Sequence, residues 1–136
     1  MDKQALRRTA ETFGCAGCDN PFAQDGEMTV FRHRGNKKWF GIYFRVPRRI
    51  FGQEEGSEYA LNVKCDPALA RLLFATYAGI VPAYHMSKTH WITVRLNGSV
   101  PAEEIERLLR LSYDIVAPKS RASAAKNVKK SGKSQA

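Results

Sequence analysis

The stretch GIVPAYHMSKTHWITVRL, residues 79–96, begins just after a predicted helix and runs into a predicted strand. Apolar and polar residues alternate over residues 90–96, which is typical of a half-buried strand. His90 is in phase with Ile92 and Val94 and is therefore interpreted as facing inward. The loop and the first two residues of the strand collect polar and aromatic side chains, namely Tyr84, His85, Lys88, His90 and Trp91. This cluster makes the loop a candidate small-molecule pocket.

Helices are predicted on both sides of this stretch. Asp66 and Pro67 begin the first helix, because aspartate accepts hydrogen bonds from free N–H groups and proline fits the first turn. Gly79 is interpreted as its stop signal. The second helix begins after Pro101 with two acidic residues at the positive end of the helix dipole. The predicted buried stripes are Leu69, Leu72, Leu73 and Thr76 or Tyr77 in the first helix, and Ile105, Leu108, Leu109, Ser112 and Ile115 or Val116 in the second.

The N-terminal half is predicted to supply one helix and three strands. The helix spans residues 2–13, and residues 15–27 are rich in turn formers and are interpreted as a loop. Strands follow at 28–33, 39–46 and 58–65, where apolar residues recur at every second position. On the second of these strands, the side chains predicted to share one face are Phe40, Ile42, Phe44 and Val46.

The predicted order is therefore helix, three strands, helix, strand, helix. It indicates an α+β fold, a two-layer sandwich whose antiparallel sheet has its helices packed on one face, because a sheet with an apolar side must bury it. At 136 residues the chain suits a single domain, placed at residues 1–117, followed by a tail at 118–136. The tail has no large apolar residue apart from Val128 and is predicted to be disordered.

Charge is unevenly distributed along the chain. It has 22 Lys plus Arg against 13 Asp plus Glu, a net charge of +9. Six basic residues and no acidic residue lie between Lys119 and Lys133, so the tail carries two-thirds of the net charge.

No apolar run approaches the roughly 18 residues needed to span a bilayer, and the N-terminus has no apolar signal-peptide core. Three cysteines argue against a disulfide framework, and a cytoplasmic protein is expected.

Several segments resemble the MmcQ/YjbR family of small bacterial proteins. They are NVKCDP at 62–67, GIVPAYHMSKTHWITVRL at 79–96, VP at 100–101 before an acidic helix start, SYDIV at 112–116, and EMTVFRHRGNKKWFGIYFRVPRR at 27–49. The resemblance covers roughly residues 21–116. It implies a CyaY-like fold, related in layout to frataxin, and a proposed role in DNA binding through two protruding hairpin wings. It implies no reaction.

The two predicted hairpin connections carry the residues expected to bind DNA. In the first, residues 34–38, Gly35 and Asn36 are available for positive φ. Basic side chains on such turns can reach phosphates, which gives affinity without sequence preference, and Trp39 can stack on a base. The acidic residues Glu54, Glu55 and Glu58 are expected to weaken the second connection. The candidate nucleic-acid-binding residues are Arg32, Arg34, Lys37, Lys38, Trp39, Arg48, Arg49, Lys129 and Lys130.

The leading hypothesis is thus a non-enzymatic DNA-binding protein that contacts phosphates with low specificity. The alternative is a small-molecule-binding or accessory protein whose pocket lies at the loop from Pro82 to Trp91. No catalytic residue, cofactor or metal site is expected, because no acid adjoins the histidines in sequence and the Cys15–Cys18 pair lacks the second pair that a structural zinc site needs. Cys65 is interpreted as a small core residue.

Overall fold

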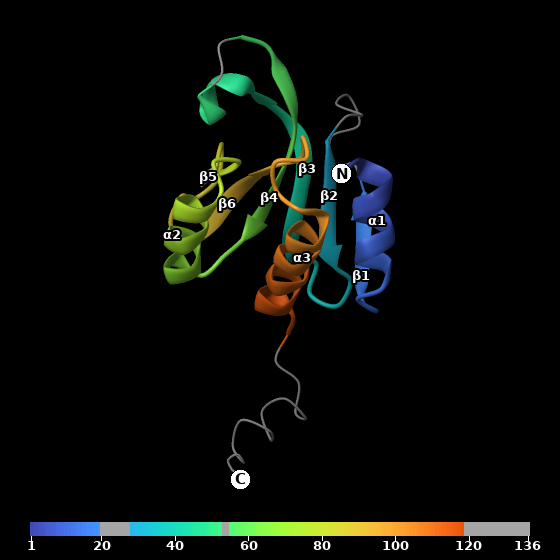
Figure 1. The fold of residues 1–136 in the computed structure, drawn as a ribbon. Helices are drawn as coiled ribbons and strands as arrows, with labels where there is room; N and C mark the ends of the chain where they lie inside the picture. The colour runs from blue at the N-terminus through green and yellow to red at the C-terminus, as the bar shows by residue number, and fades with distance from the viewer. Residues whose placement is uncertain (20–27, 53–54, 119–136) are drawn as a thin grey trace.

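A computed structural model describes residues 1–19, 28–52 and 55–118, and shows one antiparallel sheet that carries its helices on one face (Figure 1). The elements are α1 (Lys3–Glu11), β1 (Ala16–Asp19), β2 (Thr29–His33), β3 (Trp39–Pro47), the 3-10 helix η1 (Arg48–Phe51), β4 (Ser57–Lys64), α2 (Pro67–Thr76), β5 (Ile80–Pro82), β6 (Trp91–Arg95) and α3 (Ala102–Val116). The six strands lie in the order β1-β2-β3-β4-β6-β5. The predicted α+β class is confirmed.

The main core fills the space between the sheet and the three helices. Phe31 and Phe40 on the strands are fully buried and share this core with Leu6 of α1, Leu73 of α2 and Leu108 of α3. Each such side chain contributes about 1.5–3 kcal/mol relative to leaving it exposed. The helices are therefore held to the sheet mainly by apolar burial.

The opposite face of the sheet, called here the back face, is also partly covered. A small cluster of Ile42, Ala83 and Trp91 is buried there, and the side chains packed against it are Met28, Trp39, Phe44 and Met86. Ala83, Met86 and Trp91 all belong to the stretch at residues 79–96. This stretch therefore closes the back face while the helices close the front.

A β-bulge in β3 changes which side chains face the helices. Phe31 pairs with Gly41 and Arg32 pairs with Trp39, so Phe40 is an extra residue between two paired positions. Phe40 consequently lies in the helix-side core, whereas Ile42 belongs to the back-face cluster. The prediction that these two side chains share a face was wrong, because strict alternation does not allow for an inserted residue.

The hydroxyl of Ser112 completes the β3–β4 ladder beside this bulge. The paired register of the two strands reaches Gly41 opposite Val63. At the next position, the Lys64 N–H donates to Ser112 Oγ at 2.9 Å, and Ser112 Oγ donates to the Phe40 carbonyl at 2.6 Å. Ser112 is fully buried on α3. A side chain from a helix thus takes the place of a direct hydrogen bond between two strands.

Two short strands were missed by sequence reasoning. Residues 16–19 form β1 and residues 80–82 form β5, both predicted to be loop. Among the described residues, β1 pairs with β2 alone and β5 with β6 alone, so they form the two edges of the sheet. Their glycine and proline content weakens the strand pattern and is tolerated at a sheet edge. The sheet therefore has six strands instead of four.

The helix starts were predicted better than the buried stripes. Asp66 caps α2, accepting hydrogen bonds at its carboxylate from two backbone N–H groups of the first turn. Leu72, predicted to be buried, is 63% exposed, and Ala70 is buried in its place. In α3, Val116 is buried and Ile115 is 50% exposed. The apolar stripe of α2 is narrower than its leucine content indicates.

Gly79 is required for close packing and does not stop α2 by a left-handed turn. The helix ends at Thr76, three residues earlier. A Cβ atom at Gly79 would lie 2.7 Å from Ser99 Oγ and 3.2 Å from Arg95 Cβ. The glycine therefore allows the chain to enter β5 directly beside β6.

Replacing Ser112 by alanine is expected to lower the free energy of unfolding by about 2–4 kcal/mol, since two buried backbone groups lose their partner. Urea unfolding followed by circular dichroism measures the change. Ser87→Ala, at an exposed serine, is the control and should stay within about 0.5 kcal/mol of the parent. An equally small effect at Ser112 would show that the ladder closes without the hydroxyl.

Candidate nucleic-acid interface

The connection between β2 and β3, residues 34–38, is called here the basic turn, and its backbone is closely held. Lys37 N donates to the His33 carbonyl at 2.8 Å, and His33 N donates to the Lys38 carbonyl at 2.9 Å. Lys37 has a φ of 67° and is the left-handed residue of the turn, so the prediction that Gly35 or Asn36 would take this conformation was wrong. Asn36 instead uses its side chain, which accepts from Lys38 N at 3.0 Å.

Helix α3 anchors the basic turn to the body of the protein. Asn36 Nδ2 donates to the Val116 carbonyl at 2.8 Å, at the last turn of the helix. His33, buried at the end of β2, stacks on Tyr113 with ring centroids 5.1 Å apart, and its Nδ1 accepts from Gly35 N at 2.9 Å. Sequence reasoning saw the turn as a protruding wing and missed this anchor, because contacts over such separations leave no local pattern.

The cations of the basic turn lie at the surface of the protein. Arg34, Lys37 and Lys38 are exposed, and none of them forms an ion pair with an acidic residue in the described part of the chain. Arg32, at the end of β2, differs because its Nε lies 3.3 Å from Asp19 Oδ1. Three of the four basic residues predicted around this turn are thus available to a polyanion.

The β3–β4 connection, residues 45–59, is called here the arginine hairpin, and it uses most of its cations internally. Glu58 accepts hydrogen bonds from Arg95 at 2.8 and 2.9 Å and from Arg48 at 3.1 Å. Arg95 also lies over the ring of Phe51, 4.9 Å from its centroid. Arg49 is exposed and has no acidic partner among the described residues. Glu58 is therefore a neutralised partner inside the hairpin, although it was predicted to repel phosphates.

The basic turn and the arginine hairpin lie at opposite ends of the sheet. Figure 1 shows the β3–β4 hairpin extending beyond the rest of the fold, with the β2–β3 connection at the other end beside the end of α3. Strand β3, which joins them, has nine residues, so the two connections are roughly 30 Å apart. They cannot act together on a short stretch of ligand.

Charge separates between the two layers of the described structure. The α-helices with their N-cap residues contain six basic and seven acidic residues, whereas the strands and their connections contain ten basic and three acidic ones. The ten are Arg32, Arg34, Lys37, Lys38, Arg45, Arg48, Arg49, Lys64, Lys88 and Arg95. The undescribed segments of these connections add Asp25, Glu27 and Glu54. The strands and their connections, called here the sheet side, therefore still have a surplus of four positive charges.

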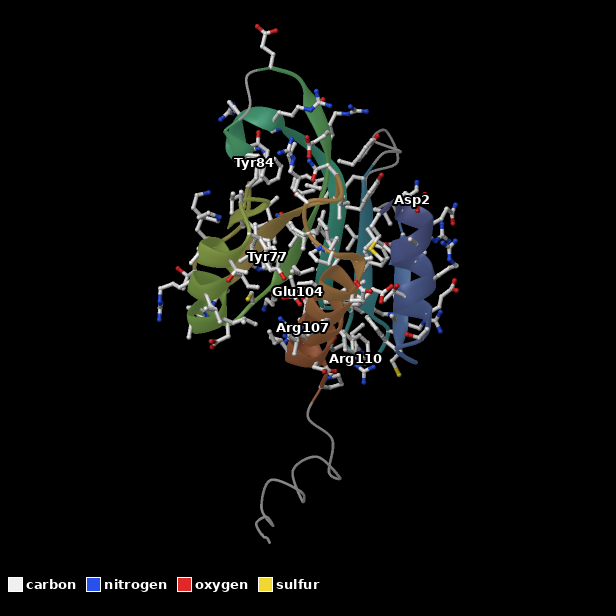
Figure 2. The ribbon with its side chains drawn as sticks, viewed as in Figure 1. Asp2, Tyr77, Tyr84, Glu104, Arg107 and Arg110 are labelled. Atoms are coloured by element: carbon white, nitrogen blue, oxygen red, sulfur yellow. The ribbon has the colours of Figure 1, made fainter. Side chains whose placement is uncertain are left out.

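The two arginines of α3, Arg107 and Arg110, pair with acidic residues of the same helix (Figure 2). Arg107 contacts Glu104 through two hydrogen bonds of 3.0 and 2.6 Å, and this pairing lowers the pKa of the Glu104 carboxyl. Arg110 Nε lies 3.3 Å from Asp114 Oδ1. The excess of positive charge is therefore a property of the sheet side.

The loop of the alternative pocket is fixed by its backbone. Asn62 Nδ2 donates to the Tyr84 carbonyl at 3.0 Å, Tyr84 N donates to Thr93 Oγ1 at 2.9 Å, and the Thr93 hydroxyl donates to Asn62 Oδ1. Asn62 and Thr93 are fully buried on neighbouring strands β4 and β6. Lys88 Nζ donates to the Ala83 carbonyl at 2.7 Å. Each polar group of this network has a partner within the protein.

The five residues of the alternative pocket do not converge on one hollow. Trp91 is buried in the back-face cluster, and His85 is exposed with a φ of 64° and its ring centroid 3.9 Å from that of Tyr84. His90 is exposed, so its predicted inward orientation was wrong; β6 begins one residue later, at Trp91. His90 borders a hollow together with Cys65 and Pro67, and that hollow contains none of the other four residues.

An apolar hollow of about 310 Å³ lies between α2 and α3. It is lined by Lys64, Cys65, Asp66, Leu69, Leu108, Leu111, Asp114 and Ile115. Burial raises the pKa of the Cys65 thiol to about 11, so Cys65 is a protonated core thiol at neutral pH, in agreement with the prediction. The flanks of two helices build this hollow, and sequence reasoning, which looked for buried stripes, did not find it.

The other two cysteines lie at the β1 edge. Cys15 is exposed and Cys18 is half-buried, and both are free thiols. Two positions three residues apart on an extended chain are separated by about 10 Å, which exceeds the roughly 7 Å limit for a disulfide.

Among the described residues, no three His, Cys, Asp or Glu side chains are grouped closely enough to hold a metal ion. None of the described helices is long and apolar enough to cross a membrane.

The architecture defines a class of small α+β proteins known from solved structures. A crystal structure of a Pseudomonas syringae protein is similar with a TM-score of 0.77 and 33% identity, over 86% of this chain and 100% of that one. The Deinococcus radiodurans protein DR2400 is similar with a TM-score of 0.67 and 30% identity, over 92% of this chain and 86% of that one.

Sequence comparison assigns the family. The YjbR family model matches residues 13–115. The uncharacterized protein YyaQ of Bacillus subtilis is 34% identical over 111 residues, which cover 81% of this chain and 92% of YyaQ. The chain belongs to the YjbR family, as its sequence motifs indicated.

Glu58 is expected to make the arginine hairpin sensitive to acid. Hydrogen bonds from Arg95 lower the pKa of Glu58, against the opposing effect of burial. A carboxyl with a lowered pKa in the folded state stabilises the protein at neutral pH, and this contribution is lost as the pH falls below about 5. Glu58→Gln should therefore cost about 1–2 kcal/mol at neutral pH.

Urea unfolding at neutral pH and at about pH 3 tests this pairing. The difference between Glu58→Gln and the parent should shrink at the lower pH. Glu55→Gln, on the same hairpin but exposed and without an ion pair among the described residues, should change little at either pH. A penalty for Glu58→Gln that is equal at both pH values would mean that charge is not its cause.

Proposed function

We propose that this protein binds nucleic acid, DNA in the first instance, through phosphate contacts made by the sheet side of the fold. The observation that carries the proposal is the separation of charge between the layers, with ten basic and three acidic residues on the described strands and connections. Phosphate contacts of this kind supply affinity with little sequence preference.

The basic turn is the strongest part of this surface. Arg34, Lys37 and Lys38 are exposed and form no ion pair in the described structure. Backbone hydrogen bonds between His33 and the turn, and the bond from Asn36 to α3, hold the backbone of the turn in place. A turn that is already ordered loses less conformational entropy when a ligand binds. The arginine hairpin contributes less, since Arg48 and Arg95 both donate to Glu58, whose charge offsets one of the two.

The basic tail would act at the same end of the protein as the basic turn. Pro118 lies beside Gly35, where a Cβ atom would be 3.8 Å from Pro118 Cγ. Lys129 and Lys130, predicted to contact phosphates, follow in the sequence and lie outside the described residues. Their part in the proposal is electrostatic attraction, which is sensitive to salt.

Removing the three cations of the basic turn should weaken DNA binding and reduce its salt dependence. Each lost phosphate contact lowers the slope of log affinity against log salt by about 0.9, so Arg34/Lys37/Lys38→Ala should lower it by about 2–3. Fluorescence anisotropy with a short labelled duplex, between about 50 and 200 mM salt, measures the slope.

The matched control removes the same charge from the helix side. Arg7, Arg8 and Arg71 are exposed and have no ion pair in the described structure, so Arg7/Arg8/Arg71→Ala changes the net charge equally. Binding by the control variant should match the parent. If both triple variants lose affinity equally, only net charge matters; if the parent does not bind DNA at low salt, the proposal is wrong.

A further inference from the structure

Four side chains form a row across the back face, at the end of the sheet that carries the basic turn. Arg32 on β2 pairs in register with Trp39 on β3, and Lys64 on β4 pairs with Trp91 on β6. The Arg32 guanidinium carbon lies 5.8 Å from the Trp39 ring centroid, and Lys64 Nζ lies 5.9 Å from that of Trp91. Cation and indole thus alternate across neighbouring strands.

The two indoles of this row differ in access. Trp91 is only 7% exposed and belongs to the back-face cluster, whereas Trp39 packs against that cluster and is half-buried. The bulge at Phe40 places Trp39 on this face, away from the helices. One aromatic surface is therefore fixed in orientation and still partly open to solvent.

Trp39 directly follows the cations of the basic turn. Lys38 precedes it in sequence, is exposed, and has no acidic partner in the described structure. A ligand that places a phosphate at Lys38 therefore meets a partly exposed indole at the next residue of the chain. Cations that follow a backbone, together with aromatic side chains for stacking, are the combination that single-strand binders use.

A duplex would make poorer use of this surface. Its bases are already stacked and paired, so an indole beside the backbone gains no stacking partner. Proteins that read a duplex commonly place a helix in the major groove. In this protein the α-helices lie on the opposite layer, where described acidic residues outnumber basic ones by seven to six.

We infer that the ligand is single-stranded nucleic acid, with an unpaired base stacked on Trp39 and the adjoining phosphates held by the basic turn. This inference rests on the proposed function and names its ligand class. Arg32, paired with Asp19, keeps the indole in position, and Lys64 adds positive charge along the row.

Tryptophan fluorescence tests the stacking directly in the parent protein. The chain has two tryptophans, and Trp91 is buried, so a base that stacks on the protein quenches mainly Trp39. Titration with oligo(dT) should quench the emission to saturation, and a duplex of equal length should quench it far less. Equal quenching by both, or none by oligo(dT), would overturn the inference without requiring any variant to fold.

Variants then distinguish base stacking on Trp39 from phosphate binding by the basic turn. Trp39→Ala should weaken oligo(dT) binding by about 5- to 150-fold, the range for loss of one stacked base, and leave duplex binding within about twofold. Phe51→Ala, at a half-buried aromatic on the arginine hairpin, is the control and should leave oligo(dT) binding unchanged. If both ligands bind equally and Trp39→Ala affects neither, this inference fails while phosphate binding stands; if neither ligand binds at low salt, both proposals fail.

Discussion

The hydroxyl of Ser112 is the contact on which the arrangement of both layers depends. It lies between the Lys64 N–H and the Phe40 carbonyl, so α3 takes part in the sheet ladder beside the bulge. Buried polar groups are costly unless they are paired, and here one side chain satisfies a donor and an acceptor at once. The same bulge turns Phe40 toward the helices and leaves Trp39 on the back face.

Helix α3 also determines where positive charge is presented. Its last two turns hold the basic turn through the stacking of Tyr113 on His33 and the bond from Asn36 to the Val116 carbonyl. The acidic residues of the same helix neutralise Arg107 and Arg110. Helix α3 therefore supports the basic end of the sheet and keeps its own surface nearly neutral. The separation of charge between the two layers depends on packing as much as on composition.

Sequence reasoning predicted the elements with strong periodicity and missed those without it. The alternation of β2, β4 and β6 and the capping residue Asp66 were sufficient signals, and each was confirmed. The edge strands β1 and β5 are too short to show a period, and an inserted residue such as Phe40 is invisible to a count of every second position. At the candidate site the basic residues were readable from composition. Their separation into layers was not, because contacts between distant segments decide it.

The network of Asn62, Thr93 and Tyr84 has a consequence for how the protein opens. The Tyr84 N–H donates to a hydroxyl fully buried between the central strands, so it reaches water only when the stretch at residues 83–91 lifts from the sheet. Because Ala83 and Met86 of this stretch pack on Ile42 and Trp91, that movement also uncovers these two side chains of the back-face cluster. In hydrogen-exchange terms the Tyr84 N–H is therefore expected to exchange with the slowly opening core rather than with the surface loops. A backbone group in an irregular segment can thus be as protected as one inside a strand.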